Sequence, residues 1–341
     1  MLCPSGLISG RIGKGKQTVA PVTSSKYDLE VALEFRSLDR FLYRVSDLNS
    51  LGDELELDAE IAERLDNCPL YLLGKRPRLS FVPGSLRVSD DSVACAVAYS
   101  IEGVSRSHEV TFPRHLFLKE EQTIEVSSYP HRELVSRDSS GTLTGTTLLA
   151  NHAHQIPDLD QRAKDLEIVY VGKGLRRSAQ DRLKHHSTLQ EILADINSYD
   201  PDSEVFALVY AFEYKKPGIA SPNVPGEITG QAAGARLRRA RAYAPSIDQQ
   251  IALVEAASIA YFQTSRYNSQ YLDFPRPTHR ILREVYKADF AALIVNIDST
   301  DLGGLRTYSE KAVAAAFHPI LVDFRKLENR SSWFRQSGDP G

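Results

Sequence analysis

The sequence is poor in cysteine, with three residues among 341, at Cys3, Cys68 and Cys95. Their number is odd, they lie far apart, and no two of them form a C-x-x-C pair. These features exclude a disulfide scaffold and a zinc site built from four cysteines. Because so little cysteine fits a reducing compartment, we expect a cytoplasmic protein.

Long apolar runs are also missing. No segment reaches the ~18 apolar residues needed to cross a bilayer, so we do not expect an integral membrane protein. The first residues show no basic segment followed by an apolar one, and hence no recognisable secretory signal. With 42% hydrophobic and 25% charged residues, the composition is that of a globular protein. The length suggests about two domains.

The net charge is only −3, but the charges are segregated along the chain. Residues 26–66 hold 5 basic and 12 acidic residues, whereas residues 173–186 hold 5 basic residues and one acid. A second basic run contains Arg236, Arg238, Arg239 and Arg241. Such local patches indicate a polyanion bound at one place on the surface, although solvated helix faces would give the same pattern.

The hydrophobic periodicity predicts an α+β fold in four parts. We expect a mobile tail over 1–25, a β-rich N-terminal domain with an acidic face over 26–134, a mixed domain over 135–275 and a C-terminal α/β extension over 276–341. Within the extension we expect a helix at 279–287, a strand at 290–297, a helix at 309–317 and a strand at 320–324.

The mixed domain has the more informative pattern. Apolar strands are predicted at 167–172 and 205–212, and a helix that opens with the capping box of Ser178 and Asp181 continues to about residue 197. The basic run around Arg236 lies in a Pro- and Gly-rich insertion after the second strand. A further helix is predicted over 247–263.

Glu255 lies on the apolar stripe of that last helix. An unpaired buried carboxylate costs several kcal/mol, so such a residue is normally paired, protonated or bound to a metal. The sequence leaves two interpretations open: a metal ligand or acid/base group, or a buried glutamate that pairs with an arginine.

A second group of residues suits a phosphodiester. The turn at Gly172-Lys173-Gly174 allows the backbone and a lysine to approach a phosphate, and Arg182 and His186 lie one turn apart on the helix that follows. Arginine can bridge two phosphate oxygens, and histidine can exchange a proton. A surface cluster without function is the alternative.

Together these motifs resemble the core of the GIY-YIG nucleases, over about residues 165–270. The shared pattern is a strand with Tyr170-Val-Gly-Lys-Gly, a helix with Arg182 and His186, a strand, a helix with Glu255, and then Arg266-Tyr267-Asn268. The resemblance implies that the 135–275 domain is a nuclease domain.

The resemblance also implies roles for these residues. Tyr170 would position the scissile phosphate or the attacking water, Lys173 would help activate that water, and Arg182 would stabilise the transition state. His186 would contact a phosphate or assist proton transfer, and Asn268 would orient the loop or the phosphate. Glu255 would hold one Mg²⁺ (or Mn²⁺), and we expect Tyr170, Arg182 and Glu255 to share one cleft.

The first tyrosine motif of the family is not found just before Tyr170, because residues 158–166 contain no tyrosine. The nearest earlier tyrosine is Tyr129, while His152 and His154 lie closer. The alternatives are that a histidine, with His154 as the candidate, replaces the tyrosine, that the first strand has diverged with a long insertion, or that the site is inactive.

The leading functional hypothesis is a metal-dependent endonuclease acting on double-stranded DNA, of a restriction or host-defence type, with a homodimer as one way to cut both strands. Two alternatives remain: a catalytically silent domain that binds nucleic acid or protein, and an enzyme for a phosphorylated metabolite. The residues expected to hold DNA are Arg176, Arg177, Arg236, Arg238, Arg239 and Arg241.

Overall fold

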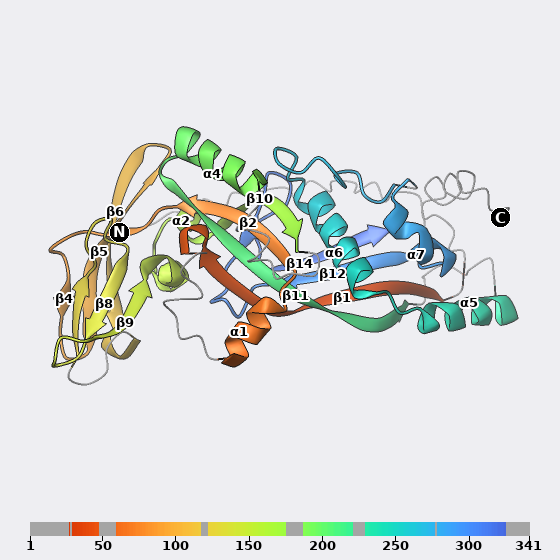
Figure 1. Ribbon diagram of the computed structural model, residues 1–341, viewed down its shortest axis with the longest axis horizontal. Coiled ribbons are helices and arrows are strands. Elements are labelled where there is room, and N and C mark those ends of the chain that lie inside the picture. Colours follow the sequence, from red (N-terminus) through yellow and green to blue (C-terminus); the bar gives the residue numbers. More distant parts are fainter. Residues whose placement is uncertain are drawn as a thin grey trace, which may run out of the picture.

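The computed structural model describes residues 27, 29–47, 59–116, 122–174, 187–220, 229–276 and 278–324. It shows a mixed α/β protein built around one large curled sheet, in agreement with the expected α+β class (Figure 1). None of the described helices is both long and apolar enough to cross a membrane.

The large sheet has seven strands in the order β13-β10-β2-β11-β1-β12-β14. Its strands are β1 (Glu30–Arg44), β2 (Leu70–Pro77), β10 (Leu166–Lys173), β11 (Ser203–Ala220), β12 (Ala292–Asp298), β13 (Thr307–Tyr308) and β14 (Phe317–Asp323). β2 pairs antiparallel with both β10 and β11, whereas β1 pairs parallel with β12, so the sheet is mixed.

Two smaller sheets stand at one end of the molecule (Figure 1). In one, β5 (Ser92–Ile101) pairs with β3 (Ser80–Phe81), β4 (Arg87–Val88) and β6 (Val104–Pro113). The other contains β7 (Thr123–Val126), β8 (Glu133–Arg137) and β9 (Leu143–Leu148). They enclose a separate apolar cluster around Phe81, Val97 and Phe112.

Helices cover both faces of the large sheet. The α-helices are α1 (Ala59–Asp66), α2 (Gln161–Lys164), α4 (Ser187–Tyr199), α5 (Gly230–Ala242), α6 (Ile247–Phe262) and α7 (Arg283–Lys287), and the 3₁₀ turns are η1 (Val45–Asp47), η2 (Arg114–Leu116), η3 (Leu149–Gln155) and η4 (Arg280–Leu282). The main core holds α6 side chains, and a second core on the opposite face holds Leu189, Ile192 and Ile196 of α4.

The helix predicted over 247–263 is confirmed as α6. Ser246 caps its first turn by accepting a hydrogen bond from the Gln249 amide, and Gln263 ends it in the left-handed region at φ 51°. The strands predicted at 167–172 and 205–212 are β10 and part of β11, and the described part of the helix predicted from Ser178 is α4.

Several expectations about organisation were wrong. The sequence predicts a separate N-terminal β-rich domain over 26–134, but β1 and β2 are hydrogen-bonded inside the large sheet with β10, β11 and β12. The basic run is helix α5 and not an irregular insertion. No helix forms over 309–317, because Thr307 and Ala315 form a two-residue antiparallel bridge and Ser309 accepts hydrogen bonds from the amides of the turn between them.

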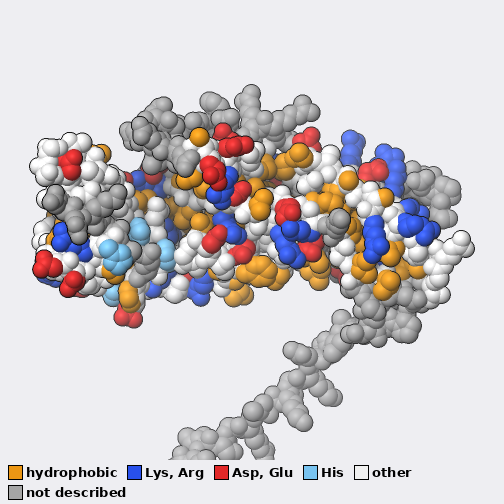
Figure 2. Space-filling model, turned by 90° about the horizontal axis from the view of Figure 1, so that it is seen from below, with side chains coloured by type: hydrophobic (Ala, Val, Ile, Leu, Met, Phe, Trp, Pro, Cys, Tyr) orange, Lys and Arg blue, Asp and Glu red, His pale blue; other side chains and the backbone are white. Residues whose placement is uncertain are grey.

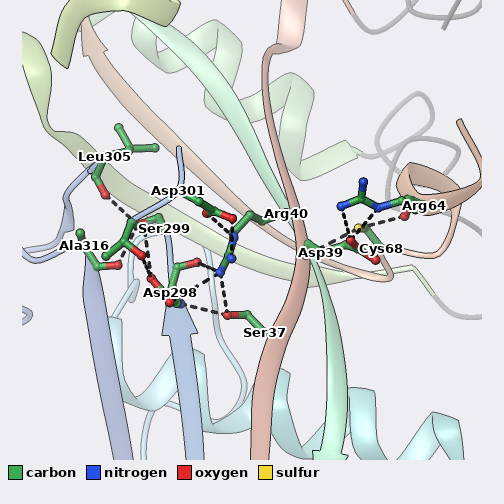
Figure 3. Close-up of polar contacts among 11 residues, drawn as sticks. Ser37, Asp39, Arg40, Arg64, Cys68, Asp298, Ser299, Asp301, Leu305 and Ala316 are labelled. Atoms are coloured by element: carbon green, nitrogen blue, oxygen red, sulfur yellow. Dashed lines mark hydrogen bonds and ion pairs between the residues drawn. The ribbon is translucent and has the colours of Figure 1, made fainter. Parts of the chain in front are cut away.

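β1 is anchored on both sides where its pairing with β11 is irregular, between Ser37 and Arg40. Arg40 donates to the Asp298 carbonyl oxygen at 2.8 Å and pairs with Asp301, whereas Asp39 points the other way and accepts from Arg64 at 2.6 Å (Figure 3). Cys68 lies beside that second pair, and burial raises the pKa of its thiol to about 12. Cys68 is therefore not a reactive thiolate near neutral pH.

Candidate active site at the end of the β2–β10 pair

Lys173 and Glu255 form a half-buried ion pair where β10 meets α6. The Lys173 Nζ lies 2.6 Å from Oε2 of Glu255, and the two side chains are 18% and 12% exposed. Burial raises the pKa of the Glu255 carboxyl, and the charge of Lys173 opposes part of that shift. Glu255 is thus paired, as one interpretation of the sequence required, but its partner is a lysine and not an arginine.

Asn268 holds the strand that carries Lys173. Its Nδ2 donates to the Val171 carbonyl at 2.9 Å, and its Oδ1 accepts from the Val171 amide at 3.0 Å and from the Thr264 hydroxyl at 2.7 Å. β13 pairs with β10 only at Leu166 and Glu167, so Asn268 satisfies the outer edge of β10 beyond that point. Asn268 is buried, and its role in this structure is to orient the strand.

Replacing Asn268 with alanine would leave the amide and carbonyl of Val171 without these partners. An unsatisfied buried polar group costs about 1–3 kcal/mol, so we expect the free energy of unfolding to fall by about 2 kcal/mol or more. Urea unfolding measures this loss. The control is Gln270→Ala at an exposed site nearby, where the change should stay within about 0.5 kcal/mol. Equal stability of the two variants would contradict this role.

Tyr71 lies at the same end of the sheet and was not singled out from the sequence. It pairs across the strands with Gly172, and a Cβ at position 172 would lie 2.4 Å from Cζ of Tyr71. Glycine is therefore required beside Lys173 because the Tyr71 ring covers it. The Tyr71 ring is fully buried, with its centroid 6.0 Å from that of Tyr170.

Tyr170 and Glu255 do not face one cleft, contrary to expectation. An irregularity in β10 between Ile168 and Tyr170 sends Val169 and Tyr170 to the face that α4 covers. Val171 packs in the core on the α6 face, where Lys173 reaches Glu255. Tyr170 and Tyr71 thus lie on one face of this end of the sheet, and the Lys173–Glu255 ion pair lies on the opposite face.

His154 does not belong to this group. It lies in η3 against Gly303, and burial lowers the pKa of its imidazole, with the charges of His152, Arg76 and Lys164 adding to the shift. Arg76 and Lys164 are at the end of the β2–β10 pair opposite to Lys173, about 20 Å along the strand at ~3.3 Å per residue. The hypothesis that His154 replaces the first tyrosine is wrong on this geometry.

Arg236 is also misassigned as a DNA contact. Its side chain is 1% exposed, donates to the carbonyl oxygens of Leu29 and Asp289, and pairs with Glu30 at 2.7 Å. Arg238, Arg239 and Arg241 are exposed on the same helix. The predicted site residues Arg176, Arg177, Arg182 and His186 lie outside the described residues.

Comparison with known proteins gives no family for this chain. No family model matches the sequence, and neither the curated proteins nor the solved structures include a match. The interpretation of the site therefore depends on its own geometry.

Proposed function

We propose that the chain is a metal-dependent endonuclease that hydrolyses phosphodiester bonds in DNA. The observation that carries the proposal is that Glu255, Asn268 and Tyr71 each meet one of residues 171–173 at the end of β10, with Tyr71 on the opposite face of the sheet from Glu255. The chain separates these residues widely. In the GIY-YIG pattern that the sequence resembles, the strand with the first tyrosine lies beside the strand of Tyr170. We assign that position to β2 and the first tyrosine to Tyr71.

Lys173 is one half of an ion pair, and a lysine side chain attracts phosphate. We assign it to phosphate binding and to keeping Glu255 ionised, in place of the activation of water that the resemblance implied. Because the Tyr71 ring is buried, it can contact DNA only if this end of the sheet rearranges; Tyr170 packs beneath it and positions it.

Glu255 is the residue that would hold the metal. Among the described residues no group of three or more His, Cys, Asp or Glu side chains is arranged to bind an ion. A single carboxylate nevertheless fits Mg²⁺, which commonly takes one or two protein carboxylates and fills its other positions with water and substrate phosphates. When bound, the ion neutralises phosphate charge and makes water a stronger nucleophile.

The exposed cations that would bind the duplex lie on α5, on α7 and in the η4 turn just before α7. α5 packs into the same core as α6 through Ala240, and the charges gather at the end of the molecule that carries α5 (Figure 2). The exposed residues are Arg238, Arg239, Arg241, Arg280, Arg283 and Lys287. The last three were not predicted from the sequence, because they are spaced apart in a segment that also contains an acidic residue, Glu284.

The triple variant Arg238→Gln, Arg239→Gln, Arg241→Gln should bind duplex DNA more weakly at every salt concentration. Each lost phosphate contact lowers the slope of log affinity against log salt by about 0.9. Fluorescence anisotropy with a labelled duplex at several salt concentrations measures both effects. A charge-matched control replaces Arg64, Arg87 and Arg162, which each pair with a carboxylate elsewhere. Equal slopes in the two triple variants would contradict the assignment of α5.

The proposed activity is tested with supercoiled plasmid, single-stranded DNA and RNA, each with Mg²⁺, Mn²⁺ or EDTA. We expect nicking or linearisation of the plasmid with either metal and none with EDTA. DNA binding without cleavage under all conditions would contradict the proposal and favour a catalytically silent binding domain.

A further inference from the structure

A cleft of about 270 Å³ lies between the smaller β5 sheet and the start of β11. Tyr99, Ser100 and Ser105 of the small sheet line one side, the Tyr129-Pro130 turn lines another, and Pro201 and Asp202 close it before β11. The Arg78 amide donates to the Asp202 carbonyl at 2.7 Å, so a backbone hydrogen bond joins two of the segments that line the cleft.

Three arginines line this cleft, against one acidic side chain, Asp202. Each guanidinium group has a hydrogen-bond or ion-pair partner. Arg78 donates to the Ser203 carbonyl at 3.1 Å, Arg106 lies 3.3 Å from an Asp160 oxygen, and Arg132 donates to Glu204 at 3.3 Å. Long cationic side chains are therefore already ordered around the space, which reduces the entropy that a ligand must remove.

Arg132 lies close enough to other arginines for their charges to act on it. Burial lowers the pKa of Arg132; the charge of Glu204 opposes that shift, and the charges of Arg78 and Arg44 add to it. The Arg132 Nε is buried and has no hydrogen-bond partner in the described part of the chain. The Glu204 carboxylate interacts with two arginines, because the charge of the buried Arg76 acts on it as well as that of Arg132. An anion in the cleft would give these guanidinium groups a further charge-assisted hydrogen-bond partner.

Tyr129 adds an aromatic surface at the rim. Its side chain is 87% exposed, and its ring meets that of His131 edge-on with centroids 6.0 Å apart. A tyrosine so exposed beside a cationic cleft leaves one ring face available for a planar, polarisable group. Nucleobases stack on such rings, while arginines bind the phosphates attached to them.

We propose that this cleft binds a nucleoside phosphate, with the phosphate on Arg78, Arg106 and Arg132 and the base on Tyr129. The phosphate source is either a free mononucleotide or one nucleotide of a DNA strand. The cleft lies at Arg78, beyond the end of β2 opposite to Tyr71, about 20 Å from the proposed active site at ~3.3 Å per residue. It is a second site, and it does not depend on the proposed nuclease activity.

Isothermal titration with AMP, adenosine and inorganic phosphate, together with anisotropy of a labelled single-stranded 12-mer, tests the proposal on the full chain. We expect AMP to bind more tightly than phosphate or adenosine if the source is a free nucleotide. Binding of the 12-mer alone would assign the site to a DNA strand. In both cases Arg78→Gln and Tyr129→Ala should weaken binding about tenfold each.

Arg78 and Tyr129 are both exposed, so these variants should fold, whereas Arg132→Gln would also break a buried pair. The control is Arg87→Gln, an exposed arginine of the same small sheet that pairs with Glu109. Absence of binding to both nucleotide probes, or binding that Arg78→Gln leaves unchanged, would overturn the proposal. Cleavage of plasmid by the Arg78→Gln variant would show that such a failure is separate from the proposed nuclease function.

Discussion

Glu255→Gln should abolish metal-dependent DNA cleavage, with a loss of at least about a thousandfold, because it removes the carboxylate proposed to hold the ion. The substitution keeps the size of the side chain and its place on α6. Glu255→Gln also removes the partner of Lys173, so we expect some loss of stability, smaller than for the more deeply buried Arg236 because the Lys173 side chain is 18% exposed. Plasmid cleavage and urea unfolding, measured on one preparation, separate the two effects.

The matched control for Glu255 is Glu167, which lies on β10, the strand that carries Lys173. It also lies beside a lysine, with Lys75 Nζ 3.6 Å from its Oε2, but at the far end of β10. Glu167→Gln should therefore keep wild-type cleavage. If both variants cleave normally, or both lose activity together, Glu255 has no special part in the reaction.

Arg236→Met should lower the free energy of unfolding by about 3–5 kcal/mol, the usual cost of removing one partner from a buried ion pair. The Arg236 guanidinium fastens the start of β1 to α5 and to Asp289, and it lies 4.4 Å from the centroid of the Tyr27 ring. Its loss removes the guanidinium that pairs with the buried Glu30 carboxylate at 2.7 Å. Chemical denaturation at neutral pH measures the change.

Arg238→Met is the control for Arg236. Arg238 lies two residues further along α5, on its exposed face, and the substitution should change stability by no more than about 0.5 kcal/mol. Adding Glu30→Gln to Arg236→Met should recover part of the loss, because the stranded charge is then removed. An Arg236→Met protein as stable as wild type would contradict the view of Arg236 as a buried anchor. It would reopen its assignment to DNA binding.

Local patterns in the sequence predicted the helices and strands with strong periodicity. The apolar stripe of α6, with Glu255 in it, can be identified from residues that are close together in the sequence. The same is true of β11, which is apolar on both faces. The 309–317 segment has helical composition, but its pairing with Thr307 overrides that preference.

Contacts between distant segments were beyond the sequence. β2 and β10 pair antiparallel, but the strands of the two smaller sheets lie between them in the sequence. No local pattern therefore indicates that Tyr71 lies opposite Gly172. The usable signal was a second short apolar strand with a tyrosine, Leu70–Leu73, which a search limited to the residues just before Tyr170 misses. The sequence does not distinguish Arg236 from its exposed neighbours, because the residues that bind the buried Arg236 side chain, Glu30 and Asp289, are far away in the chain.

Counting bound Mn²⁺ by electron paramagnetic resonance is the most direct test of the central claim, that Glu255 holds a divalent ion at the end of β10. The protein is measured with an uncleavable phosphorothioate duplex, which supplies the remaining oxygen ligands. We predict one Mn²⁺ per chain, displaced by Mg²⁺, lost in Glu255→Gln and kept in Glu167→Gln. A wild-type protein that binds no ion, or a Glu255→Gln variant that binds it equally well, would contradict the account.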